Sequence, residues 1–137
     1  MKYVLDSSTA LKWVLAEPDS ARALQLRDEF SKELLDLTAP DVFQFEIGHA
    51  LTRAERQNRI LVGQASLFWA DIMTTSPQLE PSGVLVPRAL VLSSTFRIGL
   101  YDCLYLAVAE RERCKVVTGD QRLVNTFPAL TVHLSSV

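Results

Sequence analysis

The chain has 137 residues, 48% of them apolar, and a formal net charge of −2. A chain of this length buries roughly two thirds of its unfolded surface. We therefore expect one domain, residues 1–137, that folds without a disulfide bond or a structural metal. The charge argues against a broad, strongly basic nucleic-acid surface, and the absence of a signal peptide and of an 18-residue apolar run predicts a cytoplasmic protein without a membrane segment.

The first half of the chain alternates short apolar runs with helical patterns. Asp6-Ser7-Ser8 follows the first run and can cap a helix that Pro18 ends. Pro40 introduces a helix with an apolar stripe at three- and four-residue spacing. The expected elements are a strand at 3–5, a helix from about 9 to 17, a helix from 19–20 with apolar positions up to Leu34, a strand at 35–39, and a helix whose stripe runs from Phe43 to Ala54.

The second half is organised around residues 101–120. Asp102 opens an almost wholly apolar helix, which we interpret as a buried crossover, and a β-branched strand follows it. Cys103 and Cys114 lack the spacing of a metal site and are interpreted as reduced thiols. The expected elements are a helix at 63–73, an extended segment at 79–81, a helix at 87–96, the crossover helix to about 113, and then a strand at 115–118, a short helix at 122–125 and a strand at 130–134.

Strands that alternate with helices predict an α/β fold, with right-handed βαβ units and a parallel sheet covered on both faces. Ligands of such sheets bind beyond the carboxyl ends of the strands. Asp6 and Asp120 leave strands at that edge, Asp102 starts a helix there, and Glu46 has a helix position that could lean towards them. Each aspartate alone could simply be a helix cap.

Four carboxylates that converge cannot all stay ionised without compensation. Oxygen-only ligands suit Mg²⁺ or Mn²⁺, and a carboxylate-held Mg²⁺ can activate water for phosphodiester hydrolysis. Without these four acids, the rest of the chain has 14 basic and 12 acidic residues, a net charge of +2.

Four motifs in order, VLDSS at 4–8, FEIGHAL at 45–51, YDCLYLAVAE at 101–110 and VVTGDQRL at 116–123, resemble PIN-domain ribonucleases, and most closely the VapC-type toxins. The resemblance implies a PIN-like three-layer α/β/α sandwich with a central parallel sheet. It also implies Mg²⁺- or Mn²⁺-dependent endonucleolytic cleavage of RNA and inhibition by a cognate VapB-type antitoxin. By position, it assigns the acidic site to Asp6, Glu46, Asp102 and Asp120, and supporting hydroxyl groups to Ser8 and Thr118.

The hypothesis also predicts two binding surfaces, one for RNA and one for the antitoxin. Arg53 lies two helical turns after Glu46, and Arg53 and Arg56 are predicted to contact RNA phosphates, although a solvated helix face is the more common explanation of such arginines. A homodimer is expected, and an apolar groove formed by Leu11, Trp13 and Val14 is predicted to bind the antitoxin. Aromatic residues at these spacings are nevertheless more often core.

Other functions stay open at this point. A non-catalytic PIN-fold module that binds RNA or protein would retain the fold without cutting, and a protein that acts mainly in assembly would expose an apolar patch. Glu46-x-x-His49 has the spacing of a di-iron helix, but no second copy follows. A phosphoacceptor receiver domain would need adjacent acids where this chain has Asp6-Ser7-Ser8.

Overall fold

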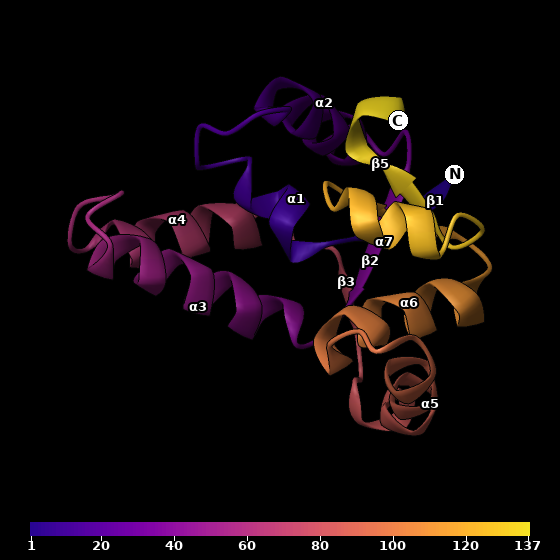
Figure 1. Cartoon of the computed structure of the whole chain (residues 1–137). Coiled ribbons are helices and arrows are strands. Elements are labelled where there is room, and N and C mark those ends of the chain that lie inside the picture. Colours follow the sequence, from indigo (N-terminus) through magenta and orange to yellow (C-terminus); the bar gives the residue numbers. More distant parts are fainter.

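The computed structural model describes all 137 residues and contains one five-stranded parallel sheet in the order β3-β2-β1-β4-β5 (Figure 1). Helices connect successive strands, as the alternating sequence pattern predicts. The elements are β1 (Lys2–Leu5), α1 (Ser7–Leu11), α2 (Ser20–Ser31), β2 (Asp36–Pro40), α3 (Phe43–Arg56), α4 (Gln64–Met73), β3 (Gln78–Glu80), the 3₁₀ turn η1 (Gly83–Leu85), α5 (Val86–Phe96), α6 (Leu100–Glu112), β4 (Lys115–Thr118), α7 (Gln121–Thr126), β5 (Thr131–His133) and the 3₁₀ turn η2 (Leu134–Ser136).

Helices lie on both sides of the sheet. In Figure 1, α2 lies above the strands and α5 and α6 lie below them, while α3 and α4 form a hairpin that extends to the left. β1 is the central strand, and Val4 is in register with Thr38 of β2 and with Val116 of β4. The prediction of a three-layer α/β/α fold with a parallel sheet is therefore confirmed.

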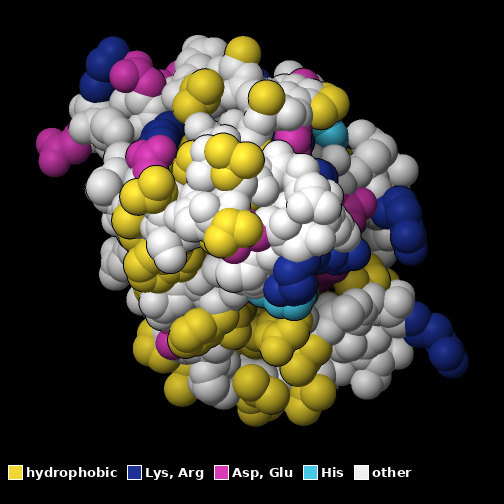
Figure 2. Space-filling view, turned by 90° about the vertical axis from the view of Figure 1, so that its left-hand side faces the viewer, with side chains coloured by type: hydrophobic (Ala, Val, Ile, Leu, Met, Phe, Trp, Pro, Cys, Tyr) yellow, Lys and Arg dark blue, Asp and Glu magenta, His cyan; other side chains and the backbone are white.

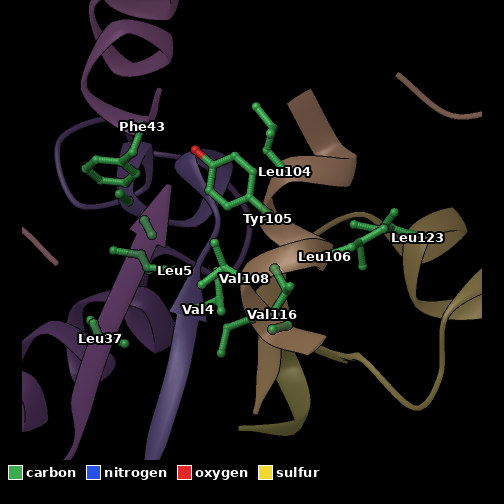
Figure 3. Packing of buried hydrophobic residues seen from close by; sticks show 14 of the residues in the cluster. Val4, Leu5, Leu37, Phe43, Leu104, Tyr105, Leu106, Val108, Val116 and Leu123 are labelled. Atoms are coloured by element: carbon green, nitrogen blue, oxygen red, sulfur yellow. The ribbon is translucent and has the colours of Figure 1, made fainter. Parts of the chain in front are cut away.

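Helix α6 forms the middle of the core. Its residues from Cys103 to Ala109 are all buried, and they pack against β1, β2 and β4 on one side and against α5 on the other. Figure 3 shows Tyr105 and Val108 of α6 among the side chains of β1 and β4, close to Phe43. A helix that is covered on two sides has no solvated stripe, which explains why its sequence is apolar around most of its circumference.

The helix after β1 is shorter than predicted, because α1 ends at Leu11 rather than near Glu17. From Lys12 to Val14 the backbone N–H groups bond three residues back, in tight turns that lead the chain away from the helix axis. The indole of Trp13 thereby points into the core, where it is 6% exposed and donates a hydrogen bond of 2.9 Å to the carbonyl of Ala23. Arg27 stacks over the ring at 4.7 Å.

The second helix is also shorter than predicted. It ends at Ser31, and Glu33 takes a left-handed conformation with a φ of 59° that a continuing helix does not allow. Leu34 is consequently 67% exposed and is not part of the helix's apolar face.

No single helix is long and apolar enough to cross a membrane; only Gly83–Phe96 and Leu100–Glu112 taken together would meet a test of length and composition, and they are bent by 117°.

Candidate active site

The structure brings the four predicted acids together at the carboxyl edge of the sheet. Asp6 directly follows β1, Asp120 comes two residues after β4, Asp102 lies in the first turn of α6, and Glu46 lies in the first turn of α3. Their charges interact as a connected group. Asp120 raises the pKa of Asp6 and of Asp102, and Asp6 and Asp102 together raise the pKa of Glu46.

Asp6 is held by Ser8 and Thr118, the two hydroxyl groups that the resemblance assigned to the site. Ser8 Oγ donates a hydrogen bond of 2.9 Å and Thr118 Oγ1 one of 2.7 Å, both to Oδ2 of Asp6. Burial raises the pKa of Asp6 and these hydrogen bonds oppose the rise. Because both donors use the same oxygen, Oδ1 of Asp6 has no side-chain partner.

Glu46 is fixed by a residue that we did not predict. The phenol of Tyr105, which is 2% exposed, donates a hydrogen bond of 2.6 Å to Oε1 of Glu46. Burial raises the pKa of Glu46 and this hydrogen bond opposes the rise. The only signal in the sequence is a hydroxyl-bearing residue in an otherwise apolar helix, three positions after Asp102 and therefore on the same side of α6.

Asp102 has no hydrogen-bond donor of its own. Its pKa is raised from 3.8 to about 6, mainly because the carboxyl group is partly buried, and further by the charges of Asp6 and Asp120. Asp120, in contrast, caps α7, since its Oδ1 accepts hydrogen bonds from the backbone N–H groups of Arg122, at 2.9 Å, and Leu123, at 3.3 Å. The capping interpretation is thus correct for Asp120, whose Oδ2 remains free.

None of the four acids forms an ion pair with a lysine, arginine or histidine. In this arrangement no three Asp, Glu, His or Cys side chains converge closely enough to hold one ion by themselves. The acids form an electrostatically coupled group rather than a complete coordination sphere. Their chemistry still fits Mg²⁺, which accepts oxygen ligands and usually binds one or two carboxylates while it retains waters.

Two cavities lie on either side of the acids. The apolar cavity, of about 520 Å³, reaches Glu46 and is lined by Ser7, Ser8, Leu11, Val42, Phe45, Glu46, His49, Ala50 and Tyr101. The polar cavity, of about 260 Å³, reaches Asp102 and Asp120 and is lined by Phe96, Arg97, Ile98, Gly99, Asp102, Asp120, Arg122, Leu123 and Thr126. The consecutive residues Tyr101 and Asp102 point into different cavities, so the start of α6 separates the two.

The structure does not bring the three predicted groove residues together in one cavity. Leu11 lines the apolar cavity, but Trp13 does not, because its side chain is part of the core. Val14 is half-buried against the core and does not line the cavity either. The exposed aromatic groups beside the acids are instead Phe45, 70% exposed, and Tyr101, 58% exposed.

Arg53 and Arg56 lie exposed on α3 and form no ion pair. Figure 2 views the molecule from the side to which α3 and α4 extend and shows basic side chains gathered beside a histidine, with hydrophobic side chains exposed around them. The predicted RNA contacts are thus accessible, and their role stays a prediction.

Comparison with known proteins identifies the family. The PIN domain family matches residues 3–126 of this chain. Ribonuclease VapC3 of Pyrobaculum aerophilum is 24% identical over 132 residues, which are 95% of this chain and 98% of that protein. Two crystal structures share the fold. The structure of PAE2754 from Pyrobaculum aerophilum has a TM-score of 0.73 at 21% identity and covers 99% of this chain and 94% of its own. That of VapBC2 from Rickettsia felis bound to a DNA fragment from their promoter has a TM-score of 0.65 at 15% identity and covers 97% and 98%. This chain therefore belongs to the PIN domain family.

Proposed function

We propose that this protein is a metal-dependent endoribonuclease of the VapC type. The observation that carries the proposal is the coupled group of Asp6, Glu46, Asp102 and Asp120, which is partly buried and has no basic partner. Uncompensated carboxylates of this kind destabilise a fold, so their presence indicates that a cation neutralises them. Membership of the PIN domain family and similarity to Ribonuclease VapC3 support the choice of RNA as substrate.

The same four acids would hold Mg²⁺, or Mn²⁺ in its place. When bound, such an ion supplies a nucleophilic water and offsets the charge that develops on the phosphate oxygens. The residues of this chain orient the ligands. Ser8 and Thr118 fix one oxygen of Asp6 and leave the other free. Tyr105 fixes Oε1 of Glu46 and leaves Oε2 free. These hydrogen bonds also oppose the rise in pKa that burial causes at both carboxylates.

Cleavage of single-stranded RNA by the purified protein tests this proposal. We expect EDTA to abolish cleavage and excess Mg²⁺ or Mn²⁺ to restore it. An Asp6→Asn variant purified in the same way serves as the control for contaminating nucleases and should stay inactive. A folded wild-type protein that cuts no RNA with either metal would contradict the proposal and favour a non-catalytic module that binds RNA or protein.

The apolar cavity favours a VapB-type antitoxin as the partner. A structurally similar protein, VapBC2 from Rickettsia felis, was crystallised with a DNA fragment from their promoter. Here the cavity reaches from Leu11 and the exposed ring of Phe45 to Glu46, so a bound segment could place an apolar side chain in the cavity and a basic one beside the acids. The antitoxin would then inhibit cleavage by the same contact through which it binds. Excess Mg²⁺ should partly oppose binding, because the cation and the basic side chain compete for the same acids. The expected homodimer stays a prediction.

A further inference from the structure

The polar cavity contains both acids and arginines, and its arginines have no protein partner. Arg97 ends α5 and Arg122 is the second residue of α7, and both line the cavity together with Asp102 and Asp120. Neither guanidinium forms an ion pair with any carboxylate within 4 Å. Two cations thus share a cavity with two anions without neutralising them.

The backbone on both sides of the cavity is well fixed. The N–H of Arg97 bonds to the carbonyl of Ser93 at 2.8 Å, and the N–H of Arg122 bonds to Oδ1 of Asp120 at 2.9 Å. The two arginines are therefore anchored next to the acids by the ends of two helices rather than by long loops. Each guanidinium group offers several N–H donors in one plane.

We propose that Arg97 and Arg122 bind a backbone phosphate of the RNA strand on the α5–α7 side of the acids. A guanidinium binds a phosphate with two parallel hydrogen bonds, which makes a pair of free arginines in a polar cavity a suitable phosphate site. This inference rests on the proposed function, because a divalent cation at the acids would leave the cavity with a net positive charge. A single phosphodiester group would balance part of that charge.

The position of the site places the strand on the α5–α7 side of the acids. The apolar cavity and the polar cavity are separated by the start of α6, where Tyr101 faces one and Asp102 faces the other. A phosphate on Arg97 and Arg122 places the neighbouring phosphodiester bond close to Asp102 and Asp120. The arginines act as positioning residues, since they bind the strand next to the bond that would be cut and do not take part in the chemistry.

The test measures RNA binding in Ca²⁺, which takes the same oxygen ligands as Mg²⁺ and so supplies the positive charge at the acids, and the RNA is checked for cleavage after each titration. The affinity for a fluorescent single-stranded RNA of about ten nucleotides is followed by anisotropy over a range of salt concentrations, for Arg97→Gln, Arg122→Gln, the double variant and Arg113→Gln. Arg113 is a matched control, because it ends α6 with a φ of 54°, close to the 55° of Arg97, has no ion pair and lies about 16 Å along α6 from Asp102.

We expect each cavity variant to weaken binding several-fold, and the double variant to lower the slope of log affinity against log salt by about 0.7 for each phosphate that the protein no longer binds. Arg113→Gln should match the wild type. A wild-type salt slope in the double variant, or a wild type that binds no RNA, would overturn the phosphate site. The two proposals fail separately: Mg²⁺-dependent cleavage with a wild-type KM in the double variant contradicts only the phosphate site, and arginine-dependent binding without any cleavage contradicts only the nuclease.

Discussion

An acidic side chain is paired with an arginine at one end of α6 and has no basic partner at the other end. At the far end, Glu110 accepts hydrogen bonds from both Nε and Nη2 of Arg88, at 2.7 and 2.9 Å, and the arginine lowers the pKa of Glu110. At the near end, Asp102 has no basic partner and its pKa is raised to about 6. One helix therefore carries an acid that the fold pairs with a cation and an acid that the fold leaves unpaired.

This difference supports the proposed cation site. A paired surface acid contributes little to stability, whereas an unpaired and partly buried acid beside other acids costs free energy. The near end contains Asp6, Glu46, Asp102 and Asp120, so that cost is repeated within one small region. The fold pairs Glu110 with Arg88 and leaves Asp102 without a basic partner, which supports the proposal that a cation from solution binds at the near end.

The largest effect is expected from Asp102→Asn, which removes one charge from the near end. RNA cleavage in Mg²⁺ should fall by at least about 100-fold, because the remaining oxygens bind the ion and orient its water less well. The protein should stay folded. Glu110→Gln, a matched change at the far end of α6, should leave cleavage unchanged. A folded Asp102→Asn protein with full activity in the RNA cleavage assay would show that the unpaired acid at the near end is no more important for cleavage than the paired acid at the far end.

The same contrast can be drawn for apolar groups near the site. Trp13 is buried and Phe45 is 70% exposed, although both lie close to the acids in the sequence or in space. Trp13→Ala should lower the free energy of unfolding by about 3–5 kcal/mol, measured by urea denaturation. Phe45→Ala should change it by less than about 0.5 kcal/mol.

Phe45→Ala should instead weaken antitoxin binding by about tenfold, as measured by calorimetry, because it removes an aromatic group from the apolar cavity. Wild-type antitoxin affinity in this variant would place the partner on another surface. A stable, fully folded Trp13→Ala protein would contradict the core position of the indole.

The pH dependence of stability should also differ between the two ends. The pKa of Asp102 is raised from 3.8 to about 6, so between these values the folded protein holds a proton that the unfolded chain has released. The free energy of unfolding in EDTA therefore falls as the pH rises through this window, by about 2 kcal/mol once solvent screening is allowed for, and the loss is nearly complete about one pH unit above the folded pKa.

Urea denaturation at a series of pH values measures this effect. Asp102→Asn should flatten the fall and be more stable than the wild type at pH 7.5. Glu110 contributes in the opposite sense, because its pKa is lowered from 4.5, and its contribution is lost as the solution becomes more acidic than that. A free energy of unfolding that rises steadily from pH 4 to 7 in EDTA would show that ionisation of the near-end acids does not destabilise the fold.

The smallest effect is expected from Arg53, which lies about 10 Å along α3 from Glu46. Arg53→Ala should weaken RNA binding a few-fold and reduce the salt dependence by about one phosphate contact. Arg113→Ala, far from the acids on α6, is the control. If both variants keep the salt dependence of the wild type, Arg53 is an ordinary solvated arginine.

The sequence predicted the sheet and the placement of the acids because both follow from local signals. Asp6 directly follows a short apolar run, Asp120 follows another after a single glycine, and the burial of α6 is evident from its composition. The end of α1 left no such signal, since no glycine or proline precedes Pro18, and Trp13 was therefore placed on a groove instead of in the core. The hydrogen bond from Tyr105 to Glu46 joins residues 59 positions apart, and no local pattern encodes such a contact.

The most direct test of the central claim is the effect of Mg²⁺ on thermal unfolding at pH 7.5. If the coupled acids are a cation site, the Tm of the wild-type protein should rise as the Mg²⁺ concentration increases. The Glu110→Gln protein should show the same rise. Asp102→Asn should start from a higher Tm in EDTA and gain less from Mg²⁺. An equal response of the wild type and Asp102→Asn, or no response of the wild type at millimolar Mg²⁺, would contradict the account.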